Sequence, residues 1–199
     1  MSISLQESKT KENLMRAFAG ESQARNRYTF AASQAKKENL DAVAEAFLFT
    51  AGQEKEHAEV FYDFLKEVAG TTIEVDGAYP VDVFENTVAL LRAAQHNEYE
   101  EYDDAYPKFA EVAKEEGFTQ IANAFEKIAE IEKSHGDRFA MLAELLESNQ
   151  LYKAETNKQW MCLNCGYIFD GTAVPEKCPV CQHAKGYFIP VELAPYVKQ

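Results

Sequence analysis

Two Glu-x-x-His motifs, Glu54–His57 and Glu132–His135, combine residue types at a spacing that suits metal chemistry. Residues three apart on an α-helix differ by about 60° in direction and about 4.5 Å along the axis, so one motif can offer a carboxylate and an imidazole to one centre. Both motifs fall on the apolar stripe of their helix, where a buried carboxylate is costly unless a cation compensates it. The motifs therefore predict a metal site among packed helices.

Each motif follows a single glutamate on the same kind of stripe, Glu21 before the first and Glu98 before the second, at separations of 33 and 34 residues. The two halves therefore form a weak internal repeat. Four carboxylates and two imidazoles are the ligand set of ferritin-like di-iron and di-manganese bundles, and these ligand types suit iron or manganese. Glu101 adds a fifth acid to the stripe, and two divalent ions nearly balance five carboxylates.

Four segments repeat apolar residues at helical spacing and are long enough for bundle helices. These segments are Lys11–Lys37, Ala42–Ala69, Val88–Glu116 and Gln120–Glu147. Pro107 lies in the third segment and should kink or break that helix just beyond its acidic residues. The stretch Gly70–Asp82 lacks a helical period, so we expect it to connect two helical hairpins.

All four cysteines lie near the C-terminal end of the sequence, in two Cys-x-x-Cys pairs that twelve residues separate. The pairs are Cys162 with Cys165 and Cys178 with Cys181. This spacing predicts a four-thiolate metal site, for which zinc and iron are both suitable. The polar N-terminal segment does not have the pattern of a secretory signal, so we expect thiols in a reducing compartment rather than a disulfide framework.

The run Cys162–Asp170 together with Cys178–Cys181 resembles a rubredoxin, a small one-iron electron carrier. The gap between the pairs is shorter than in free-standing rubredoxins, and Gln182 stands where glycine is usual. The resemblance implies one iron at the four thiolates, with a zinc ribbon as the alternative. Trp160 and the aromatic residues around the cysteines should build a small core that needs its metal to fold.

The whole layout resembles the rubrerythrin family, in which a ferritin-like di-iron bundle precedes a short-gap rubredoxin tail. The resemblance implies a mainly α fold. We expect a ferritin-like four-helix bundle over residues 1–148, a linker over 149–158 and a rubredoxin-like four-cysteine domain over 159–199. It also implies two bridged irons in the bundle and one iron in the tail of each chain.

The resemblance assigns roles to the bundle residues. Glu54 and Glu132 would bridge the two irons, Glu21 would bind the first, and Glu98 with His135 would complete the second. On the first iron, Glu101 would bind in the diferric state and give way to His57 in the diferrous state. In this family tyrosines hydrogen-bond ligand carboxylates, and Tyr28 and Tyr106 are our candidates; the alternative is that both are core aromatics. His96 and His183 are expected to be exposed.

The function that the resemblance implies is the reduction of hydrogen peroxide to water in the cytoplasm. Electrons would come from NAD(P)H through a separate reductase or a rubredoxin, and would pass through the tail iron. The family forms homodimers in which each tail serves the di-iron site of the other subunit. The alternatives are a ferritin-like ferroxidase that handles or stores iron, and a zinc-stabilised structural protein.

Composition excludes other classes of function. The chain has 199 residues and a formal net charge of −13, so nucleic acid is not an expected partner, whereas a basic redox protein would be attracted. No apolar run reaches the length of a membrane span. The sequence therefore predicts an acidic helical redox protein with two separate metal sites.

Overall fold

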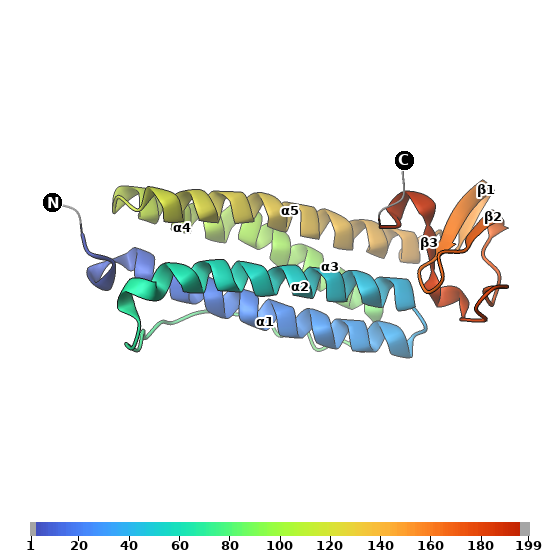
Figure 1. The fold of residues 1–199 in the computed structure, drawn as a ribbon, viewed down its shortest axis with the longest axis horizontal. Coiled ribbons are helices and arrows are strands. Elements are labelled where there is room, and N and C mark those ends of the chain that lie inside the picture. Colours follow the sequence, from blue (N-terminus) through green and yellow to red (C-terminus); the bar gives the residue numbers. More distant parts are fainter. Residues whose placement is uncertain (1–2, 196–199) are drawn as a thin grey trace.

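The computed structural model describes residues 3–195, which form a long helical bundle with a small β-rich tail at one end (Figure 1). The helices in this range are α1 (Lys9–Lys37), α2 (Asp41–Asp63), α3 (Thr87–Glu100), α4 (Tyr106–Glu115) and α5 (Thr119–Glu147). Helix α1 pairs with α2, while α3 and α4 both pack on α5. None of the helices between residues 3 and 195 has the length and apolarity that crossing a membrane requires.

The apolar stripes of the helices build two separate core clusters. One contains Phe47 of α2 and Phe139 of α5, and the other contains Phe61 of α2 and Phe125 of α5. On both helices the predicted ligands lie between the residues of the two clusters, and the clusters extend onto the other helices in the same way. Packing of the apolar residues therefore holds the polar turns of the helices against one another in the middle of the bundle.

The third predicted helix is interrupted, as the position of Pro107 indicated. A π-helical segment, Glu101–Ala105, separates α3 from α4, and Pro107 lies in the first turn of α4. Proline is tolerated there because the first turn of a helix leaves its N–H groups unpaired in any case. The π segment begins at one of the predicted acidic residues, so the irregularity lies beside the candidate site.

The connection between the two hairpins is long. After α2 a 3₁₀ turn covers Phe64–Val68, and residues 71–84 then contain neither helix nor strand. This segment runs along the bundle (Figure 1) and reaches α1 through ion pairs of Arg16 with Asp76 and of Arg27 with Asp82. The segment therefore forms part of the wall of the bundle.

The tail is a three-stranded antiparallel sheet in the order β2-β1-β3, formed by Lys153–Cys162 (β1), Ile168–Ala173 (β2) and Phe188–Pro190 (β3). Trp160 pairs with Phe169 across β1 and β2 and is fully buried. Strand β1 begins at Lys153, so the second half of the segment 149–158 is strand rather than linker. The polar residues at the start of β1 belong to the sheet because this strand pairs with β2.

The tail contacts its own bundle at the turn between α1 and α2, which lies at the end of the bundle (Figure 1). A Cβ on Gly186 would lie 2.0 Å from the carbonyl oxygen of Asn39, so only glycine permits this approach. The contact is therefore close, and it places the tail beyond the first residue of α2.

Candidate metal centre

Two groups of buried ligand atoms meet in the middle of the bundle. The first group is Glu21, Glu54, His57 and Glu132, and the second is Glu54, Glu98, Glu132 and His135. Within each group the ligand atoms lie within 4.8 Å of one another. Glu54 and Glu132 belong to both groups, so each is placed to contribute one oxygen to either side. The geometry suits two metal ions that share two carboxylates.

The contacts of His135 show why a cation fits among these groups. Its Nδ1 lies 2.9 Å from Glu54 Oε1 and 2.9 Å from Glu132 Oε2. Yet none of these three atoms has a hydrogen-bond partner of acceptable geometry among residues 3–195. Both oxygens of Glu132 share this condition, as does one oxygen each of Glu21 and Glu98. Buried polar atoms without partners are costly, and lone pairs that converge in this way are typical of metal ligands.

The pKa values of the buried glutamates also indicate that the site suits a cation. Burial raises the pKa of Glu21 to about 8 and also raises the pKa of Glu98 and Glu132. Burial acts in the same direction on Glu54, but its close contacts with the two histidines lower its pKa to about 2. The protein's own compensation is thus protonation of the imidazoles, and bound metal ions would replace those protons.

The buried carboxylates in turn raise the pKa values of the two histidines. Burial by itself would lower the pKa of His135, but its close contacts with the carboxylates of Glu132, Glu54 and Glu98 raise it to about 11. Burial would likewise lower the pKa of His57, but the carboxylates of Glu21 and Glu54 raise it to about 10. The site therefore attracts positive charge strongly, which favours divalent or trivalent ions.

Two tyrosines hold the outer carboxylates. The Tyr28 hydroxyl donates a hydrogen bond to Glu98, and the Tyr106 hydroxyl donates one to Glu21. Both tyrosines are also buried in the core, where Tyr28 packs on Phe139. They therefore act both as core aromatics and as hydrogen-bond donors to the carboxylates, so the two roles considered for these residues are compatible.

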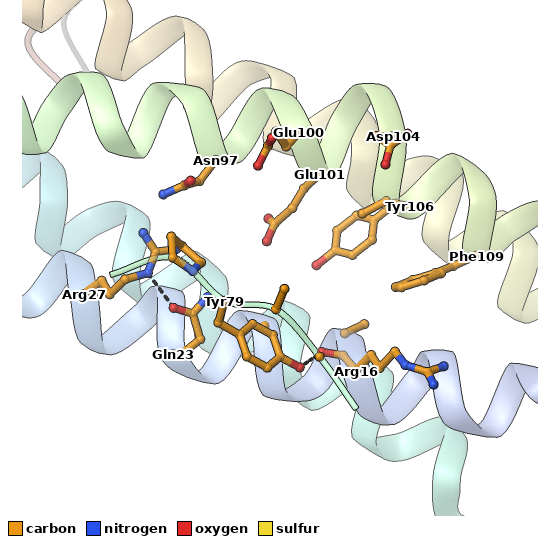
Figure 2. Close-up of a pocket in the computed structure, with 16 residues that line it drawn as sticks. Arg16, Gln23, Arg27, Tyr79, Asn97, Glu100, Glu101, Asp104, Tyr106 and Phe109 are labelled. Carbon is orange, nitrogen blue, oxygen red and sulfur yellow. Dashed lines mark hydrogen bonds between the residues drawn. The ribbon is translucent and has the colours of Figure 1, made fainter. Parts of the chain in front are cut away.

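Glu101 is the one predicted bundle ligand that lies outside both groups. It begins the π-helical segment, and its carboxylate points into a cavity beside Tyr106 (Figure 2). Burial raises its pKa well above the usual value, with further contributions from Glu21 and Glu98. In the structure His57, not Glu101, completes the group that contains Glu21.

Three residues that the sequence did not identify support His135 from α2 and α5. Its Nε2 lies 3.1 Å from Gln53 Oε1, and Arg138 Nη1 donates to Thr50 Oγ1 at 2.7 Å and to Gln53 Oε1 at 3.3 Å. A neutral His135 that donates its Nε2–H to Gln53 keeps the Nδ1 lone pair for a metal. Gln53 directly precedes a ligand and Arg138 follows one by three residues, but their contact crosses two helices.

We expect Gln53→Leu to weaken metal binding in the bundle by about 10- to 100-fold, because His135 loses the acceptor that fixes its tautomer. Titration of the metal-free protein with ferrous or manganous ions measures this affinity. Gln120→Leu, at an exposed position in the first turn of α5, is the control. Equal affinities for both variants would show that Gln53 does not orient His135.

The four cysteine sulfurs form a second site in the tail and also lie within 4.8 Å of one another. Cys162 and Cys181 are 3.7 Å apart and Cys165 and Cys178 are 3.6 Å apart, far beyond a disulfide bond. A tetrahedron with metal–sulfur bonds of about 2.3 Å has edges of about 3.8 Å, so these separations suit one ion.

The environments of the thiols and of the remaining histidines differ. Burial raises the pKa of Cys162 to about 12, whereas a backbone hydrogen bond at His183 lowers that of Cys181 to about 6. His183 is half-buried against Tyr187 rather than exposed, because the chain folds back over the second cysteine pair. His96 is exposed, as predicted.

Comparisons with known proteins agree with both sites. The family model described as Rubrerythrin matches residues 12–143, and the model of the rubredoxin-like domain of rubrerythrin matches residues 160–189. The rubrerythrin of Clostridium perfringens is 46% identical over 93% of this chain and 95% of that protein. The rubrerythrin of Porphyromonas gingivalis is 44% identical over 96% of this chain and 94% of that protein. The solved structure of all-ferrous nigerythrin superposes with a TM-score of 0.62 at 28% identity, covering 92% of this chain and 90% of that one.

Proposed function

This chain belongs to the rubrerythrin family, and from that membership we propose that it is a non-haem di-iron peroxidase that reduces hydrogen peroxide to water. Its cofactors are two irons in the bundle and one in the tail. The observation that carries the proposal is the pair of ligand groups that share Glu54 and Glu132, in one chain with a four-thiolate site. Peroxide takes up two electrons and two protons as its O–O bond breaks, which gives two waters.

The positions of the residues support the following ligand roles. Glu54 and Glu132 would be shared by the two irons, Glu21 would hold one of them, and Glu98 with His135 would hold the other. His57 and Glu101 would alternate on the first iron, and the structure presents His57 in the group. When bound, the two irons supply the two electrons that one peroxide molecule requires.

The surrounding residues keep the site ready for this reaction. Tyr28 and Tyr106 fix the outer carboxylates by hydrogen bonds, and Gln53 fixes His135. The apolar clusters on either side exclude water, which strengthens every charge interaction within the site. The chain's own contribution is thus orientation and a dry, charged interior.

Electron delivery is proposed to cross between subunits of a homodimer. The tail contacts the bundle at the start of α2, whereas Glu54 lies thirteen residues further along that helix, about 20 Å at 1.5 Å per residue. A tail from a second subunit could lie nearer to the bundle irons. We propose that electrons reach the tail iron from NAD(P)H through a separate reductase or a rubredoxin, in the cytoplasm, where thiols stay reduced.

Metal analysis with visible spectroscopy tests the proposal. We expect about three irons per chain and a red ferric–thiolate spectrum that dithionite bleaches and peroxide restores. Zinc at the cysteines, with a colourless protein, would contradict the electron path. A closed many-subunit shell in size-exclusion chromatography would instead indicate a ferroxidase that stores iron.

A further inference from the structure

A cavity of about 290 Å³ lies beside the bundle site, between α1, the π-helical turn and the segment that connects the hairpins (Figure 2). Its wall includes Glu101 and Tyr106, and the hydroxyl of Tyr106 binds the ligand Glu21. The cavity therefore reaches the side chains that surround the metal site. Its lining combines apolar surface with charged and amide groups, among them Arg16, Gln23, Arg27, Asn97, Glu100 and Asp104.

Tyr79 forms part of the wall of this cavity. Its ring lies 3.8 Å from the point where a Cβ on Gly20 would stand, and a Glu101 oxygen lies 4.0 Å from the same point. The ring and the carboxylate therefore both border the space that a side chain at Gly20 would fill. The Tyr79 hydroxyl donates to the Arg16 carbonyl at 3.1 Å, which fixes the ring on α1. Because 41% of Tyr79 is exposed, one part of the residue faces solvent while another lines the cavity.

The segment that carries Tyr79 is fixed on both sides of that residue. Three residues later, Asp82 accepts from Arg27 Nη1 at 2.7 Å and from Asn97 Nδ2 at 2.8 Å. The Arg27 and Asp82 side chains are only 14% and 15% exposed, so this contact is well shielded. Three residues earlier, Asp76 pairs with Arg16 at 2.9 Å but is 96% exposed, and contributes little. Asp82 is therefore the main attachment.

We propose that Tyr79 controls access to the metal centre and restricts the substrate to small hydroperoxides. This inference rests on the proposed peroxidase function. Hydrogen peroxide is little larger than water and can hydrogen-bond to the polar lining. An organic hydroperoxide with a bulky apolar group must pass the Tyr79 ring and desolvate charged side chains. The size of the ring therefore favours the small substrate, and the charged groups within the lining oppose a bulky apolar one.

The test compares hydrogen peroxide with cumene hydroperoxide in single-turnover oxidation of the dithionite-reduced, iron-loaded protein, so that no reductase is needed. We expect Tyr79→Ala to lower the ratio of the two second-order rate constants by about tenfold or more, the range that pocket shape supplies. Tyr79→Phe keeps the ring but loses the hydrogen bond to the Arg16 carbonyl, so its ratio should fall less than that of Tyr79→Ala. Phe84→Ala is the matched control, because Phe84 lies in the same segment, is 47% exposed and does not line the cavity.

A second measurement needs no peroxide chemistry. The rate at which 2,2′-bipyridine removes ferrous iron should rise several-fold in Tyr79→Ala but not in Phe84→Ala. If Tyr79→Ala does not fold, Asp82→Ala should change both measurements in the same direction, because it removes the acceptor of Arg27 and Asn97 that attaches the segment.

Failure of this inference and failure of the peroxidase proposal are distinguishable. A wild-type protein that reacts with hydrogen peroxide, combined with unchanged ratios and bipyridine rates in the folded variants, would overturn only the role of Tyr79. A wild-type protein that reacts equally well with both peroxides would also overturn only the role of Tyr79. If the wild type reacts with neither, the peroxidase proposal fails, and the bipyridine rates alone decide whether Tyr79 controls access.

Discussion

Replacement of Cys162 with serine should abolish turnover driven by NAD(P)H and a reductase, yet leave the oxidation of the pre-reduced bundle by peroxide intact. Cys162 is fully buried in the tail, and its sulfur is one of the four that converge on the predicted ion. A serine hydroxyl does not replace a thiolate ligand, so the tail should lose its iron and much of its structure. The bundle should keep its metals, because the ligand groups found there among residues 3–195 consist of helix residues alone.

Two measurements separate these effects: steady-state oxidation of NAD(P)H with a reductase, and stopped-flow oxidation of the dithionite-reduced protein. Gln182→Gly is the control in the same tail. Gln182 has a φ of 61°, a conformation that glycine adopts readily, so this variant should keep the red spectrum and full turnover. Coupled turnover that survives Cys162→Ser would show that electrons do not pass through the tail. Loss of the direct oxidation as well would show that the bundle chemistry needs the tail.

The sequence predicted the members of the two ligand groups because helical geometry leaves little freedom. Once Glu54 and His57 lie on the apolar stripe of one helix, their three-residue spacing places both on the same side of the bundle. The same holds for Glu132 and His135 on α5. The apolar clusters then determine which polar turns meet, and these clusters follow from the 3.6-residue period.

The position of Glu101 could not be predicted in the same way. Pro107 indicated a disturbance of the third helix, but not that it would be a π-helical turn starting at Glu101. One extra residue in a turn rotates the side chains around it, so the straight-helix period no longer holds there. Contacts between different elements could not be predicted from the sequence either. The contact of Gln53 with His135 joins two helices, and the ion pair of Asp82 with Arg27 depends on the path of an irregular segment.

In the tail, the metal site could be predicted from the sequence but the start of the first strand could not. The cysteine spacing predicted its metal site, because four thiolates in two close pairs have few other uses. The start of β1 at Lys153 was missed, since the polar residues before Trp160 do not alternate in hydrophobicity. Their strand conformation comes from pairing with β2, which is a tertiary effect.

Glu132→Gln should remove the metal pair from the bundle and with it all reaction with peroxide. Glu132 belongs to both ligand groups, and neither of its oxygens has a hydrogen-bond partner among residues 3–195. Glutamine keeps the shape but offers one neutral oxygen, so it cannot serve both sides at once. The loss of affinity should exceed the factor of about 10 to 100 that is typical of residues that only support a ligand.

Thermal unfolding measures this loss without any assay of activity, because metal that binds only the folded protein stabilises it by mass action. At a free metal concentration of about 1,000 times Kd the gain is about 4 kcal/mol for one site, which would raise the unfolding midpoint of wild type by several degrees. That rise should disappear in Glu132→Gln. Glu130→Gln is the matched control, because Glu130 lies on the same helix, is exposed and forms an ion pair with Lys127 at the surface. Metal that stabilised Glu132→Gln as strongly as Glu130→Gln would mean that Glu132 does not bridge two ions, and the dinuclear assignment would have to be abandoned.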